Sequence, residues 1–129
     1  MNISEKLRQV IEDSGMTRTF ISREARIAHR SLNNLLDGDS AVRLNVADRL
    51  ADFFNLGFVE ASTGKRKRGS LAEVLHKELI RSKDTRYRIS EDTGIDYAAL
   101  RRFETEQTDI QIRTAEALSD FFRLALVKK

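Results

Sequence analysis

The sequence contains no cysteine, no proline and no tryptophan, and its only aromatic residues are seven phenylalanines and two tyrosines. Without cysteine, the chain can form no disulfide, no cysteine-ligated zinc site and no thiol nucleophile. The absence of proline, together with 33% charged residues, favours a compact helical protein. No apolar run reaches membrane-spanning length, and the opening residues MNISEKLRQ lack the apolar core of a signal peptide. We therefore expect a soluble cytoplasmic protein that does not enter a membrane.

The positive charge is concentrated in one short segment. Residues 1–56 hold eight basic and eight acidic side chains, and residues 71–129 hold eleven of each. The net charge of +3 therefore comes entirely from residues 57–70, where Lys65–Arg68 face a single acid, Glu60. The sequence predicts two neutral halves joined by a cationic linker.

The two halves are copies of one another. A shift of 68 residues superposes Thr85–Glu106 on Thr17–Gly38 without a gap. Identical residues continue on both sides of this stretch, at Glu5/Glu73, Leu7/Leu75, Ala47/Ala115, Leu50/Leu118, Asp52/Asp120, Phe53/Phe121, Phe54/Phe122 and Leu56/Leu124. Register kept over such a length indicates a tandem duplication. The expected units are a first domain at 1–56, a linker at 57–70 and a second domain at 71–129, each near the lower size limit for a core that folds unaided.

The stretch Thr17–Gly38 has the pattern of two short helices joined by a tight turn. Thr17 is a good N-cap, and the apolar residues that follow it repeat at helical spacing. The second helix buries its leucines and leaves His29, Arg30, Asn33 and Asn34 pointing outward. A helix exposed in this way and braced by another is how a helix-turn-helix presents side chains to a DNA major groove.

Further helices complete each half. A capped helix is expected at the start of each copy, and a longer one at about 44–55 and 112–123. Each half then ends in an apolar segment, containing Phe58-Val59 or Leu126-Val127. These equivalent segments are expected to pack against each other, either within one chain as a pseudo-dimer or between chains as a homodimer. The fold class is all-α, with four to five helices per domain.

Several motifs in this order resemble the phage-repressor and Cro (XRE) helix-turn-helix family. The first copy carries G-M-T-R-x-x-I-S at Gly15–Ser22, A-x-I at Ala25–Ile27, L-L-D-G at Leu35–Gly38 and L-x-x-A-D-x-L-A at Leu44–Ala51. The second copy carries T-R-x-x-I-S, T-G-I-D, A-L-R-R-F and R-T-A-E-A-L-S. The resemblance covers nearly all of both halves and implies two tandem lambda-repressor-like domains.

The resemblance also implies which side chains would meet DNA. Residues that hold the backbone and bases at the start of the second helix fall on Thr17, Arg18, Thr85 and Arg86. Base-reading positions fall on His29, Arg30 and Asn34, beside Asn33, and on Tyr97, Ala98 and Arg102, beside Arg101. Asn pairs bidentately with adenine and Arg with guanine.

The linker cations Lys65, Arg66, Lys67 and Arg68 are expected to add phosphate or minor-groove contacts. Their replacement by serine is then expected to flatten the dependence of log K on log salt by about 3–4 units. The alternative is that the linker is only a solvated tether between the two halves.

His29 and His76 lack metal-ligand spacing, and His76 is expected on the surface. No catalytic constellation, metal site or cofactor motif is found in the sequence.

The sequence therefore favours a sequence-specific regulator, most simply a repressor, that occupies an operator in double-stranded DNA on the nucleoid. The alternative is a protein-interaction module such as an antitoxin or adaptor on the same fold. Acidic residues that follow the expected recognition helices, including Asp37, Asp39 and Asp109, favour that alternative. Arg101-Arg102, Asn33-Asn34 and the basic linker favour DNA.

Overall fold

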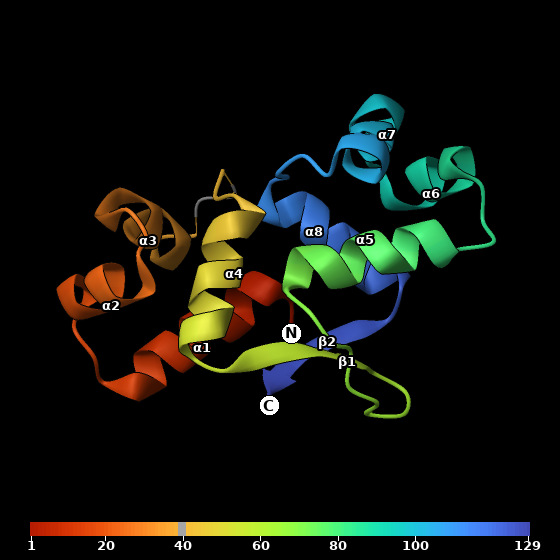
Figure 1. Ribbon diagram of the computed structural model, residues 1–129. Helices are drawn as coiled ribbons and strands as arrows, with labels where there is room; N and C mark the ends of the chain where they lie inside the picture. The colour runs from red at the N-terminus through yellow and green to blue at the C-terminus, as the bar shows by residue number, and fades with distance from the viewer. Residues whose placement is uncertain (39–40) are drawn as a thin grey trace.

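The computed structural model describes residues 1–38 and 41–129, and these contain eight α-helices and a two-stranded antiparallel sheet (Figure 1). The first half holds α1 (Ile3–Ser14), α2 (Arg18–Ala25), α3 (His29–Leu36), α4 (Leu44–Phe53) and β1 (Leu56–Glu60). The second half holds α5 (Leu71–Arg81), α6 (Arg86–Thr93), α7 (Tyr97–Glu106), α8 (Ile112–Phe121) and β2 (Leu124–Lys128). The mostly helical class is confirmed. Residues 39–40 of the acidic loop, including Asp39, lie outside the described residues.

Polar caps mark the first residues of both halves and the end of α1. Asn2 accepts a hydrogen bond of 2.8 Å from the Glu5 amide, and Ser70 accepts one of 3.1 Å from the Glu73 amide. Both form complete capping boxes, which satisfy amides that a helix N-terminus leaves free. Gly15 ends α1 at φ 67°, a left-handed conformation that glycine adopts without strain.

The strands are the element that sequence analysis did not predict. Asn55 and Arg123 take positive φ values of 59° and 55° and so end the preceding helical segments. The five residues after each are too few for a stable helix and contain mostly apolar side chains. They adopt extended conformation and pair with each other, with Phe58 opposite Leu126. The expected packing of the two apolar segments within one chain is therefore confirmed, in the form of a sheet.

The register of this sheet relates the two halves by an approximate two-fold axis. Phe58 and Leu126 are equivalent positions of the duplication, 68 residues apart, and they face each other. A second equivalent pair, Arg43 and Gln111, forms an isolated antiparallel bridge. Around it the Leu44 amide donates to the Ile110 carbonyl, and the Ile112 amide donates to the Val42 carbonyl, both at 2.7 Å. An axis through both pairs exchanges one half with the other.

Each half also caps a helix of the other half. Asp48 on α4 accepts hydrogen bonds from the Leu71 and Ala72 amides at 2.6 and 3.2 Å. Glu116 on α8, the equivalent position, accepts one from the Ser4 amide at 2.8 Å. Burial raises the pKa of Asp48 despite these two bonds.

Buried residues of both halves belong to one hydrophobic core, with Phe58 and Leu126 where the halves meet.

The linker is folded against β1, although its composition is typical of a flexible segment. The Glu60 amide donates to the Lys65 carbonyl at 2.9 Å, and the Lys67 amide donates to the Phe58 carbonyl at 3.0 Å. Lys67 also lies 2.9 Å from Glu78 and 3.8 Å from Glu60. The outer edge of β1 thus supplies the hydrogen bonds that order this segment.

Candidate functional site

The same short-range contacts position the helix pair α2–α3 and the helix pair α6–α7. Thr17 and Thr85 cap α2 and α6 through hydrogen bonds of 3.2 and 3.1 Å. At the turn, the Ser22 hydroxyl donates to the Ile27 carbonyl at 2.7 Å. Ser90 makes the equivalent bond to Ile95 at 2.5 Å. Each turn is therefore locked from within, which fixes the second helix of each pair relative to the first.

Buried side chains hold α3 and α7 against the core by one face. Leu32 and Leu35 of α3 are 0% and 1% exposed, and Leu100 and Phe103 of α7 are 1% and 3% exposed. On the opposite faces, His29 and Arg30 of α3 are exposed, whereas Asn33 and Asn34, which the sequence pattern also places outward, are half-buried. Figure 1 shows α3 and α7 at the two ends of the molecule, both on the side away from the sheet. The two-fold axis therefore gives them matching positions on one surface.

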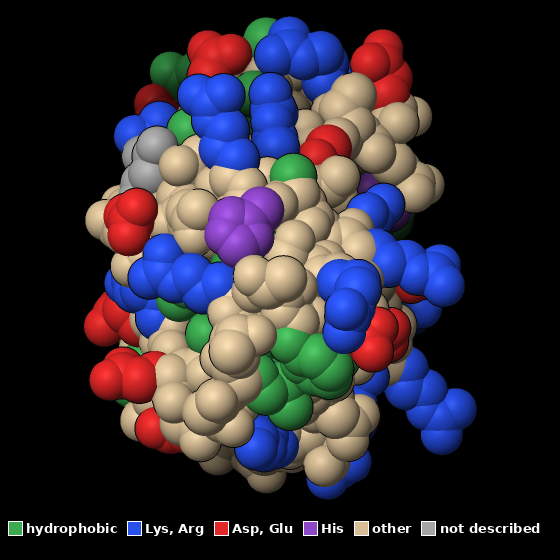
Figure 2. Space-filling model, turned by 90° about the vertical axis from the view of Figure 1, so that its left-hand side faces the viewer, with side chains coloured by type: hydrophobic (Ala, Val, Ile, Leu, Met, Phe, Trp, Pro, Cys, Tyr) green, Lys and Arg blue, Asp and Glu red, His purple; other side chains and the backbone are tan. Residues whose placement is uncertain are grey.

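On the first half, this surface is polar and basic. His29 and Arg30 are exposed at the start of α3, and Arg18 on α2 donates to the Asn33 side-chain oxygen at 2.9 Å. Figure 2 views this end of the molecule and shows Lys and Arg side chains spread over it, with Asp and Glu interspersed. Arg18 and Asn33 thus act as one hydrogen-bonding unit that bridges the two helices. Ala28, at the α3 N-cap position, has no polar side chain with which to cap the helix.

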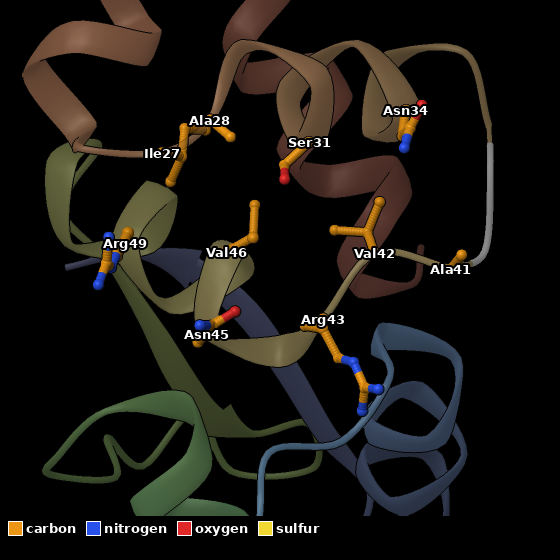
Figure 3. A pocket seen from close by; sticks show the side chains of 10 residues that line it. All are labelled: Ile27, Ala28, Ser31, Asn34, Ala41, Val42, Arg43, Asn45, Val46 and Arg49. Atoms are coloured by element: carbon orange, nitrogen blue, oxygen red, sulfur yellow. The ribbon is translucent and has the colours of Figure 1, made fainter.

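Asn34 is half-buried, and it lines a pocket of about 290 Å³ between α3 and α4. Figure 3 shows Ser31 and Val46 pointing into this pocket from opposite sides. The Arg49 guanidinium donates to the Arg26 carbonyl at the α2–α3 turn and so ties α4 to that turn. Asn34 is therefore less exposed than the sequence pattern predicts.

On the second half, two of the three corresponding cations share one carboxylate. Glu104 lies 3.1 Å from Arg86 and 2.8 Å from Arg101. The Arg86 side chain is only 14% exposed, and its Nε has no hydrogen-bond partner of good geometry among the described residues. The exposed residues of α7 include Tyr97, Ala98, Arg101 and Arg102 as well as Thr105 and the acidic Glu106, and Asp96 caps the helix through the Ala99 amide at 3.3 Å. The two surfaces are therefore alike in shape and different in chemistry.

His76 differs from its expected surface position. Its Nε2 lies 2.8 Å from the Glu104 carbonyl oxygen, and its ring packs edge-on against Phe103 at 5.8 Å. The side chain is half-buried between α5 and α7. It therefore links α5 to α7.

The linker cations lie apart from α3 and α7. The segment that contains them pairs with β1 and therefore belongs to the sheet side of the molecule (Figure 1). Lys65, Arg66 and Arg68 are outside the ion pairs of this segment, whereas Lys67 is engaged with Glu60 and Glu78, as far as the described residues show. The structure thus separates these four residues from the rest of the expected DNA-contacting set.

Sequence reasoning did not select Arg43. It is exposed, and it lines a hollow of the second half together with Arg102, Thr108 and Gln111. The cation therefore lies near the two-fold axis, between α3 and α7. The sequence shows that Arg43 and Gln111 are equivalent positions of the duplication. Only the bridge between these two residues in the structure shows that Arg43 lies near the two-fold axis.

Within the described residues, no helix has the length and apolarity needed to cross a membrane. The same residues contain no group of three or more His, Asp or Glu side chains arranged to hold a metal ion. No protein-family model, curated protein or solved structure matches the chain. The assignment of function therefore depends on the geometry described above.

Proposed function

We propose that the protein is a sequence-specific, double-stranded DNA-binding regulator, and most simply a repressor. In this proposal, α2–α3 and α6–α7 are two helix-turn-helix units of the lambda-repressor type. Each places its second helix in a major groove of the same duplex. The protein would act in the cytoplasm on the nucleoid by occupying an operator, without a cofactor and without catalysing a reaction.

The observation that carries the proposal is the two-fold arrangement of two exposed polar helices on one surface. A duplex has local two-fold symmetry, so helix-turn-helix dimers read half-sites about one helical turn apart, roughly 34 Å. Here the axis runs through Phe58/Leu126 and Arg43/Gln111 inside one chain. The chain would thus be a covalent counterpart of a repressor dimer. Because His29, Arg30 and Asn33 differ from Tyr97, Ala98 and Arg101, the two half-sites would differ in sequence.

The linker is left out of this recognition surface. A straight duplex that lies along α3 and α7 does not pass the sheet side, where Lys65–Arg68 are held. Arg43, near the axis, is better placed for a phosphate between the half-sites. This revises the expectation from sequence, in which the linker supplied several phosphate contacts.

A second candidate function is a protein-interaction module such as an antitoxin or adaptor. The specific observation in its favour is Glu104, whose one carboxylate pairs with both Arg86 and Arg101 on the second half. A recognition helix whose cations are paired internally attracts phosphate less strongly. In that case α7 would contact a protein, and α3 alone would read DNA or remain unused.

Selection of bound sites from random duplex DNA tests the proposal. The expected result is an enriched site with two unlike half-sites whose centres are separated by about 10 base pairs. Enrichment of one half-site would assign α7 to the second candidate function. A pool that stays random after repeated rounds would contradict DNA reading altogether.

Variants then assign the helices to the half-sites. Asn34→Ala is expected to cost about 1–3 kcal/mol on the selected site and to relax preference at an adenine. Arg102→Ala is expected to cost a similar amount at a guanine of the other half-site, about 1–3 kcal/mol. Lys128→Ala, an exposed cation at the end of β2, is the matched control and should leave both preferences unchanged. Equal weakening on all sequences would limit Asn34 and Arg102 to backbone contacts.

A further inference from the structure

The carboxylate of Glu104 lies between two cations of the second half. Its Oε1 atom is 2.8 Å from the Arg101 guanidinium and 3.1 Å from Nε of Arg86. The contact with Arg101 is a hydrogen bond, whereas Nε of Arg86 lacks a hydrogen-bond partner among the described residues. The Arg86 side chain is 14% exposed and that of Arg101 is 47% exposed. Arg86 thus forms the inner side of this group, which we call the Glu104 cluster, and Arg101 forms its outer side.

The first half has no equivalent of the Glu104 cluster in the part that the structure describes. The residue that matches Glu104 in the duplication is Leu36, an apolar side chain packed against the core. Arg18, which matches Arg86, donates to the neutral Asn33 instead. No ion pair is found for α2 or α3 among the described residues. The exposed cations of the first half are therefore open to a phosphate, whereas those of the Glu104 cluster are already paired.

We infer that Glu104 sets how tightly α7 holds its half-site, because it keeps Arg101 from a phosphate of the duplex. This inference rests on the proposed function. To reach a phosphate, Arg101 must leave the Glu104 carboxylate, or the carboxylate must stay beside it and repel the phosphate. In both cases part of the attraction between the cation and the duplex is lost. Glu104 thus makes α7 the weaker of the two helices on DNA, although α3 and α7 occupy equivalent positions.

A purely structural role for Glu104 makes the opposite prediction. Arg86 on α6 is half-buried beside this carboxylate on α7, and the loss of its counter-charge would loosen the packing of the two helices. A loosened α7 would bind DNA less tightly, so the replacement of a structural carboxylate would lower the affinity. The replacement of a carboxylate that masks Arg101 raises it.

Glu104→Gln tests the inference on the full chain, since glutamine keeps the shape and an acceptor oxygen but removes the charge. Binding to the selected duplex is expected to tighten about threefold to fivefold, because the ion pair with Arg101 no longer competes. The slope of log K against log salt should steepen by up to about 0.9, the effect of one further phosphate contact. Thermal melts check that the variant folds.

Glu106→Gln is the matched control, because it removes the same charge from the same helix. Glu106 is exposed at the end of α7, and no ion pair is found for it among the described residues. Its replacement should change the affinity by less than about twofold. An equal gain in both variants would overturn the inference, and so would unchanged or weaker binding by a folded Glu104→Gln variant.

Arg101→Ala gives a second test, which leaves the contact between Arg86 and Glu104 in place. In the parent chain it should weaken binding by less than about twofold, whereas in the Glu104→Gln background it should remove the whole gain of about threefold to fivefold. A loss of about tenfold in the parent chain would show that Arg101 already contacts DNA at full strength, and would overturn the inference.

Elution from immobilised heparin, a sulfated polyanion, repeats the comparison without DNA. Glu104→Gln should elute at higher salt than Glu106→Gln, because the first change alone frees a cation for the polyanion. Elution of both variants at the same salt would overturn the inference. A parent chain that binds no duplex would contradict the proposed function, while the order of elution would still decide whether Glu104 masks Arg101.

Discussion

At the scale of single residues, Arg18 and Arg86 occupy equivalent positions in the duplication and have different environments. Arg18 is exposed and bonded to the neutral Asn33, whereas the Arg86 side chain is 14% exposed and lies against Glu104. A buried charge that loses its partner is costly, while an exposed one is not. The first residue is therefore free to contact a ligand, and the second stabilises the fold.

Replacement by alanine separates these two roles. Arg86→Ala is expected to lower the free energy of unfolding by about 1–3 kcal/mol, because Glu104 remains half-buried with one partner fewer. Arg18→Ala is the matched control and should change that free energy by less than about 0.5 kcal/mol while weakening DNA binding. Urea denaturation of both variants measures the difference. Equal stabilities would contradict the structural role given to Arg86.

The sequence predicted the local features of these sites well. Thr17 caps α2 as expected, because a cap depends on neighbouring residues alone, and Thr85 caps α6 at the equivalent position of the second copy. The half-buried state of Asn34 and the ion pair of Arg86 were not predictable. Both depend on residues from other helices, which no local pattern encodes.

At the scale of helices and strands, the two halves are joined by reciprocal capping. Asp48 caps α5, and Glu116 caps α1. Sequence periodicity located the helices to within two or three residues, since α4 ends at Phe53 and α8 at Phe121. It did not predict the strands, because each needs the other as its partner and isolated five-residue segments have no strand preference of their own.

The raised pKa of Asp48 gives its capping role a pH dependence. Between 3.8, its ordinary value, and the raised pKa, the folded chain binds a proton more readily than the unfolded chain. The contribution of Asp48 to stability is therefore largest at low pH and falls as pH rises through that window. The destabilisation caused by Asp48→Asn should thus be larger at about pH 4 than at about pH 7.

Urea denaturation at both pH values measures this difference. The pKa of Glu73 is lowered by its hydrogen bonds with Ser70, so its own stabilising effect is lost as pH falls. That effect is present in both proteins, so it cancels when Asp48→Asn is compared with the parent chain. A destabilisation that is the same at both pH values would rule out the burial given to Asp48.

The position of the linker cations gives a second prediction at this scale. Because the linker lies on the sheet side, Lys65→Ser/Arg66→Ser/Arg68→Ser should leave the slope of log K against log salt unchanged within about 0.5 units for the selected duplex. Arg18→Ser/Arg30→Ser should reduce that slope by up to about 2 units, since each phosphate that a cation neutralises adds about 0.9. A slope reduced by about 3 units in the linker variant would contradict this prediction and support the phosphate contacts that the sequence led us to expect from the linker.

At the scale of the whole molecule, the duplication makes one body from two copies. The shared core, the sheet and the reciprocal caps all cross the boundary between the halves. The duplication itself, its register and the joining of the apolar ends were predictable, since they follow from repeated residues. The two-fold axis became evident only from the pairing of equivalent residues with each other.

This axis leads to the central claim, that one chain presents two recognition helices to one face of DNA at a fixed separation. The most direct test is the affinity for three duplexes: the selected site, the site with about five base pairs inserted between its halves, and the site with about ten. An insertion of half a turn moves one half-site to the opposite face of the duplex, and a full turn doubles its distance. The predicted result is a loss of about tenfold or more for both insertions, down to the affinity of a single half-site. The same dissociation constant for all three duplexes would contradict the claim.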